Sequence, residues 1–119
     1  MSTSLIVFFI TGLIFSALSV PLIRRKVKMN SWYGIRVPQA MQSENVWYEL
    51  NAIMGRYLFA FGLLTSILSL NFMLHPLEHE YQMVYFLLGI IILGTVLFVK
   101  LSFSTAAKLN KKTYNSKNN

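Results

Sequence analysis

The residues of this chain that could do chemistry fall into two short segments, and one of them contains both histidines. His75 and His79 are four residues apart, with the acids Glu78 and Glu80 beside them. Two histidines at this spacing can bind a metal ion when both project from one face of a helix. Pro76 lies between them, however, and proline is not tolerated in the interior of a helix. We therefore expect a solvated turn here and no metal site.

Other catalytic arrangements are missing from the sequence. The chain has no cysteine, which excludes disulfides, thiolate metal sites and cysteine nucleophiles. It shows neither a pair of carboxylates suited to acid–base catalysis nor a glycine-rich phosphate loop. The long apolar runs described below contain no ionisable group of the kind that proton-coupled transporters need. We expect a protein that is not an enzyme and has no catalytic residues and no cofactor.

The second segment is a polar loop with a defined turn. Gly34 permits a positive φ and Pro38 fixes its own φ, so together they would hold Arg36 at a set position. Arg36 could then pair with Glu44 or Glu49, or bind a lipid phosphate through two hydrogen bonds. The alternative is a rigid loop that only anchors the helix after it.

A helix is predicted to begin just after this turn. Ser43 suits the N-cap, and Glu44 in the first turn suits the helix dipole. Trp47, Asn51 and Gly55 then recur every four residues, which places them on one face of the helix.

These residues resemble the signature of the SdpI-like family of bacterial membrane proteins, named for the immunity protein against the sporulation-delaying toxin. The family shows an asparagine, a Tyr/Ile-Gly-Ile/Tyr-Arg-Thr-Pro turn, a Ser-Glu helix start, a tryptophan, then Asn or His and a glycine. The matching positions here are Asn30, Gly34, Arg36, Pro38, Ser43, Glu44, Trp47, Asn51 and Gly55. Val37 stands where the family usually has threonine, and Ala40 where it often has threonine or serine. The typifying immunity protein has further spans ahead of this module.

The elements that position the loop follow from composition. The 119 residues are 55% hydrophobic and 13% charged, with a mean hydropathy of +0.51. A soluble domain carries roughly 25% charged residues. Three uncharged runs, at about 4–23, 57–74 and 83–99, are long enough as helices to cross the hydrocarbon core. We predict an all-α membrane bundle of three transmembrane helices, forming one domain over residues 1–119.

The segments between and after the spans have distinct predicted structures. The loop 24–56 is expected to contain a short amphipathic interfacial helix that runs into, or bends against, the second span. The aromatic rings of Trp32, Tyr33, Trp47 and Tyr48 are expected at the level of the headgroups. The basic tail 108–119 offers nothing to bury and is predicted to be disordered.

Small residues mark faces where helices can approach closely. Gly12, Ser16 and Ser19 share a face of the first span, as Gly62 and Ser66 do on the second. These faces could pack against each other within one chain or form a homo-oligomer, and the sequence leaves both alternatives open.

The orientation follows from the basic residues. Six of them lie in 24–56 and five from Lys100 onward, whereas the N-terminus and residues 75–81 have none. The positive-inside rule then places the N-terminus outside, and the loop and the tail in the cytoplasm, of a bacterial plasma membrane.

The expected partners follow from these assignments. The basic segments would attract anionic lipid headgroups, which explains the charge more simply than nucleic acid does. The family resemblance implies protection against a membrane-active toxin peptide, and recruitment of a cytoplasmic regulator. The other hypothesis is a small structural or accessory subunit of a larger membrane complex such as a transporter.

Overall fold

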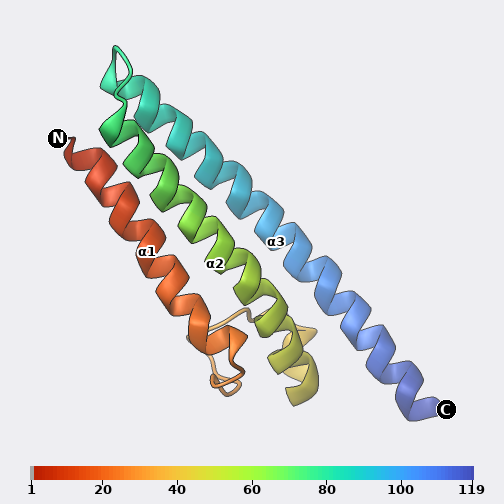
Figure 1. The fold of residues 1–119 in the computed structure, drawn as a ribbon. Coiled ribbons are helices and arrows are strands. Elements are labelled where there is room, and N and C mark those ends of the chain that lie inside the picture. The colour runs from red at the N-terminus through yellow and green to blue at the C-terminus, as the bar shows by residue number, and fades with distance from the viewer. Residues whose placement is uncertain (1) are drawn as a thin grey trace.

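Three long helices make up almost the whole protein. The computed structural model describes residues 2–119, in which α1 is Thr3–Ile23, α2 is Glu44–Leu74 and α3 is Glu80–Asn118. A 3-10 turn, η1, covers Ala40–Gln42 ahead of α2. The helices lie side by side with α2 in the middle (Figure 1), in a body of 62 × 23 × 20 Å. The predicted all-α bundle of three helices is confirmed.

Each helix is long and apolar enough to cross a membrane. The 21 residues of α1 correspond to about 31 Å, close to the thickness of the hydrocarbon core. The predicted runs 4–23, 57–74 and 83–99 lie inside α1, α2 and α3 respectively. The connection between α2 and α3, residues 75–79, is short and reverses the chain, so the two helices are antiparallel (Figure 1).

The small-residue faces bring α1 and α2 into close contact within the chain. A Cβ on Gly62 would lie 2.5 Å from both the Gly12 carbonyl oxygen and Ser16 Oγ, so the backbones touch here. Three hydroxyl groups then donate across the helix pair: Ser16 Oγ to Phe59 O at 2.9 Å, Ser66 Oγ to Phe9 O at 2.8 Å and Ser69 Oγ to Leu5 O at 2.7 Å. The intramolecular alternative for these faces is confirmed.

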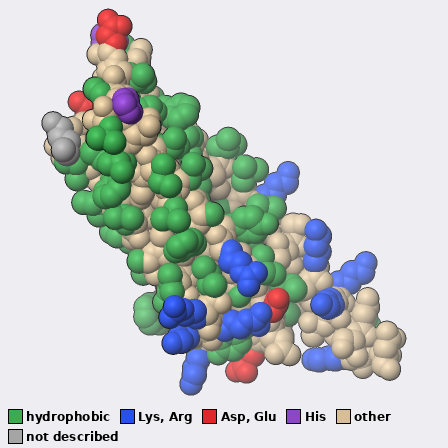
Figure 2. Space-filling view, viewed as in Figure 1, with side chains coloured by type: hydrophobic (Ala, Val, Ile, Leu, Met, Phe, Trp, Pro, Cys, Tyr) green, Lys and Arg blue, Asp and Glu red, His purple; other side chains and the backbone are tan. Residues whose placement is uncertain are grey.

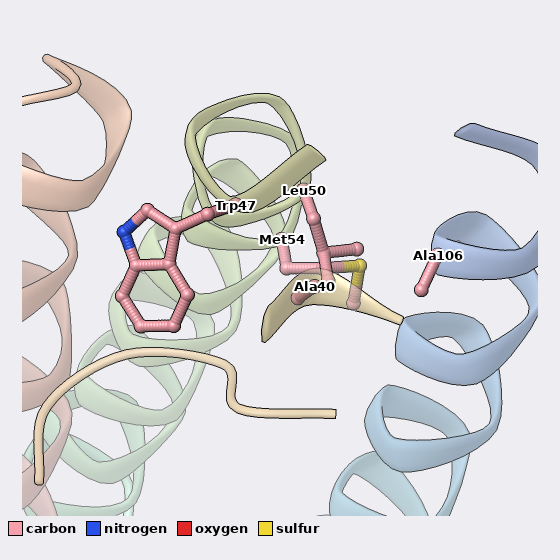
Figure 3. Close-up of a cluster of buried hydrophobic side chains, with 5 residues drawn as sticks. All are labelled: Ala40, Trp47, Leu50, Met54 and Ala106. Carbon is pink, nitrogen blue, oxygen red and sulfur yellow. The ribbon is translucent and has the colours of Figure 1, made fainter. Parts of the chain in front are cut away.

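The buried side chains form one cluster at each end of the bundle. The cluster at the end where α1 begins, which we call the outer cluster after the predicted orientation, is Leu5, Met83 and Leu87, and it joins the start of α1 to the start of α3. The inner cluster consists of Ala40, Trp47, Leu50, Met54 and Ala106. Figure 3 shows its layout: Leu50 and Met54 point from α2 toward Ala106 on α3, and the Trp47 ring points away from α3.

The predicted short interfacial helix is not a separate element. α2 runs without a break for 31 residues, so the amphipathic stretch after Ser43 and the second span are one helix. No proline or glycine pair interrupts this stretch, and an uninterrupted helix gains one hydrogen bond for each residue it adds.

The tail also differs from the prediction, because α3 continues to Asn118 instead of becoming disordered. Extending a helix costs far less than starting one, and Lys and Leu in the tail, like Ala106 and Ala107 just ahead of it, are good helix formers. The tail also has contacts that the prediction missed: Leu109 packs against the inner cluster, and Asn110 Nδ2 donates to Gln42 Oε1 at 3.0 Å.

Candidate functional site

The candidate site is the loop between α1 and α2, residues 24–43, which folds back against the last turns of α1 and the first turns of α2. The chain turns sharply at Arg25, which has a positive φ of 57°. The Lys26 N–H donates to the Pro21 carbonyl at 3.0 Å, which closes the end of α1. The Arg25 side chain then reaches α2 and binds Glu49 Oε2 at 2.6 Å. Both side chains are about half exposed, so this ion pair contributes little to stability.

Asn30 shapes the first turn of the loop. Its Oδ1 accepts from the N–H groups of Trp32 at 2.9 Å and Tyr33 at 2.6 Å, and its Nδ2 donates to the Lys28 carbonyl at 2.7 Å. An asparagine that bonds the backbone two and three residues ahead imitates a backbone turn. The family-motif asparagine therefore acts as a local fold determinant.

Gly34 lies directly against α2. Its φ of 110° is one that side-chain-bearing residues rarely adopt, and a Cβ there would lie 2.9 Å from Asn51 Oδ1 and 3.0 Å from the Trp47 ring. Both the backbone angle and the available space therefore require glycine. The prediction that Gly34 adopts a positive φ is confirmed.

Asn51 and Trp47 fasten the loop to α2. Asn51 is 2% exposed; its Oδ1 accepts from the Ile35 N–H at 2.6 Å, and its Nδ2 donates to the Trp47 carbonyl at 2.9 Å. Trp47 Nε1 donates to the Val27 carbonyl at 2.9 Å. A buried polar group must find a partner, and here the partners are backbone groups of the loop. The predicted common face of Trp47, Asn51 and Gly55 is the face that holds the loop and the end of α1, where Gly55 meets Ile23.

The Trp47 ring is not exposed, as a ring that contacts lipid headgroups would be. Its side chain is fully buried under the loop, whereas Trp32 is 81% exposed. Hydropathy alone could not distinguish the two, because Trp47 is buried only by a loop that folds back from elsewhere in the chain.

Tyr33 adds a link to α1 that the sequence analysis missed. Its hydroxyl donates to the carbonyl of Leu18 in the last turns of α1. Burial raises the pKa of the Tyr33 phenol, which therefore stays protonated and able to donate. The chain offers no sequence signal for this pairing, which depends on how the loop reverses.

Arg36 is exposed, and within residues 2–119 it forms no ion pair with Glu44 or Glu49. Arg25 holds Glu49 instead, because the turn at the end of α1 brings Arg25 to that side of α2. Glu44 is exposed in the first turn of α2, as predicted, although the Ser43 side chain makes no capping bond. Pro38 accepts from the Met41 N–H at 3.2 Å in the turn that becomes η1. The guanidinium of Arg36 is thus free to bind a group outside the chain.

The basic side chains gather at one end of the molecule. Figure 2 shows Lys and Arg side chains over the half that holds the loop and the C-terminal end, with acids among them, and the histidines and the remaining acids at the other tip. His75 and His79 are exposed there, and His79 stacks on Tyr81 with ring centroids 5.2 Å apart. No group of three potential metal ligands occurs in the part of the chain that the structure describes.

The comparison with known proteins gives one match. The model of the SdpI/YfhL protein family matches residues 26–102, which include most of the loop, all of α2 and the apolar part of α3. No curated protein and no solved structure matches the chain.

Proposed function

The chain belongs to the SdpI/YfhL protein family, and on that premise we propose that it is a non-enzymatic membrane protein that protects a bacterial cell against a membrane-active toxin. The observation that carries the proposal is the family match, because it covers most of the loop together with α2, which holds it, and the apolar part of α3. That this is a multi-pass membrane protein follows already from the three apolar helices and the family.

The proposed orientation has the N-terminus outside and the loop and tail in the cytoplasm of the plasma membrane. The gathering of basic side chains at one end of the bundle supports it, since cytoplasmic segments carry the excess of Lys and Arg. In this orientation the loop presents Trp32 and Arg36 to the cytoplasmic face. We propose that this surface contacts a partner carboxylate, either on the toxin or on a recruited cytoplasmic protein.

The test measures survival of a toxin-sensitive bacterial strain that expresses the protein. Wild type should protect, and Arg36→Ala should abolish protection at unchanged abundance, because three apolar spans drive insertion regardless of one loop charge. Arg36→Lys should fail almost as badly, because a point charge cannot replace a guanidinium that binds a carboxylate with two hydrogen bonds. Arg24→Ala is the matched control: it also removes one exposed arginine, but outside the family motif.

Three outcomes would count against this account. Full protection by Arg36→Ala would leave the loop as an anchor only. Full protection by Arg36→Lys would indicate a lipid phosphate as the group that Arg36 binds. Loss of the Arg36→Ala protein from the membrane would make Arg36 a folding residue.

The alternative function is a small accessory subunit of a larger membrane complex, and the exposure of α3 favours it. Only 6% of the most apolar window of α3 is buried, against 22% for α1 and α2, so α3 has the largest apolar surface available to a partner helix. Purification in a mild detergent discriminates the two functions. An accessory subunit must bring a stoichiometric partner, whereas a protective protein that acts alone purifies without one.

A further inference from the structure

Between the two buried clusters the bundle contains an apolar groove. Its volume is about 400 Å³, and its lining comes from all three helices, including Phe15, Tyr57, Ala60, Phe61, Thr95 and Leu101. None of the buried residues of the outer or inner cluster lines it, although Phe98 of the lining packs against the inner cluster, so the groove occupies the middle stretch of the bundle.

The lining offers almost no polar group to a ligand inside the groove. Thr95 Oγ1 already donates to the Ile91 carbonyl at 2.8 Å, and the other lining side chains are apolar or, like Tyr57, lie at the inner mouth. An apolar surface next to lipid loses dispersion contacts unless hydrocarbon fills the space beside it. The chemistry of the groove therefore fits a hydrocarbon chain.

Two cations flank the inner mouth of this groove. Tyr57 of α2 and Leu101 of α3 line the groove at this mouth. Arg56 directly precedes Tyr57, and Lys100 directly precedes Leu101. The antiparallel register places Arg56 and Lys100 at the same level, because Leu50 lies opposite Ala106 and Phe61 opposite Gly94. Both side chains are exposed, and neither pairs with an acid within residues 2–119.

These cations also mark the predicted inner boundary of the hydrocarbon core, since Arg56 precedes the run 57–74 and Lys100 follows the run 83–99. A lipid phosphate at this level would meet both of them. From Tyr57 to Leu64 the groove extends for seven residues of helix, or about 10 Å of the ~15 Å that one leaflet provides. A single acyl chain can follow that path from the headgroup inward.

We propose that this groove is a binding site for one anionic phospholipid of the inner leaflet. Its acyl chain lies between α2 and α3 beside Phe15, and its phosphate binds Arg56 and Lys100. The site is separate from the loop surface proposed for protection, and it stands whether or not that function is correct.

The test uses protein stripped of lipid and reconstituted with equal amounts of phosphatidylglycerol and phosphatidylcholine that carry the same acyl chains. Native mass spectrometry after mild detergent extraction measures the lipid retained. We expect one phosphatidylglycerol for each protein, in clear excess over phosphatidylcholine. Arg56→Gln combined with Lys100→Gln should reduce retention about 30-fold, as expected for two basic residues near an anionic headgroup.

Matched variants separate a site from general attraction. Arg24→Gln combined with Lys111→Gln removes the same charge from exposed positions away from the groove, and should leave retention near that of wild type. Ala60→Phe fills the groove and should release the lipid, whereas Ala17→Phe places the same ring on an exposed face of α1 that does not line the groove. Circular dichroism and gel filtration check that each variant is folded.

Three results would overturn the proposal. Equal retention of the two lipids by wild type would show that Arg56 and Lys100 do not select an anionic headgroup. Equal effects of the two charge-neutralised pairs would leave only general surface attraction. A lipid-free dimer that Ala60→Phe converts to a monomer would show that a second copy fills the groove.

Discussion

Replacing Gly62 by alanine should push α1 away from α2. The added Cβ would lie 2.5 Å from the Gly12 carbonyl oxygen and 2.9 Å from the Ser16 backbone nitrogen. Real Cβ atoms essentially never approach that closely, and neither obstacle is the end of a flexible side chain. The two helices must therefore separate or shift along each other.

The magnitude follows from what this separation breaks. Three interhelical hydrogen bonds connect the pair, and bonds of this kind in membranes average about 0.6 kcal/mol each, or ~2 kcal/mol together. Overpacking a close contact costs a further ~1–3 kcal/mol. Alanine offsets about 1 kcal/mol of this through its higher helix propensity. We expect Gly62→Ala to lower the free energy of unfolding by about 2–4 kcal/mol.

Gly89 provides the matched control, because a Cβ there meets nothing within 4 Å. Gly89→Ala should leave stability unchanged or raise it by up to ~1 kcal/mol. Unfolding in mixed micelles titrated with a denaturing detergent measures both variants. A Trp32→Phe background leaves Trp47, buried under the loop that follows α1, as the only tryptophan reporter. Equal stabilities of the Gly62 and Gly89 variants would refute the close α1–α2 contact.

Two further predictions concern the loop and the topology. Asn51→Ala should leave the half-buried Ile35 N–H without a partner, cost about 1–3 kcal/mol and increase proteolysis of the loop in membranes. An unchanged cleavage rate would show that Asn51 does not hold the loop. A reporter fused after Asn119 should behave as cytoplasmic and one inserted at Leu77 as external, and reversed signals at both sites would overturn the orientation.

The three-helix architecture could be predicted because each apolar run is sufficient by itself to define a helix. In a membrane every backbone group must be satisfied within the segment, so a run such as 4–23 has one structural solution wherever it is placed. The contact between the first two spans was also predictable in part. Gly12 and Gly62 mark where backbones can approach, although the sequence could not decide whether the partner is the same chain or a second copy.

The errors of prediction arise where tertiary contacts decide local structure. The tail was predicted to be disordered from its composition, but Leu109 and Asn110 find contacts with the inner cluster and with Gln42. Trp47 was predicted at the headgroups, and it is buried because residues far from it in the sequence cover it. In each case the residues that make the stabilising contact lie outside the short segment whose composition was used for the prediction.

Seven of the nine family-motif residues fall into two groups with different consequences. The first group holds the loop in place, either through side-chain hydrogen bonds to the loop backbone or because a Cβ would collide with another part of the chain: Asn30, Gly34, Trp47, Asn51 and Gly55. Substitution there should disturb the fold first and any activity only through it. Arg36 and Glu44 are exposed, and no ion pair occupies either within residues 2–119. Glu44 still suits the dipole of α2 from its first turn, whereas Arg36 has no such role, and this makes Arg36 the residue at which activity and folding can be tested separately.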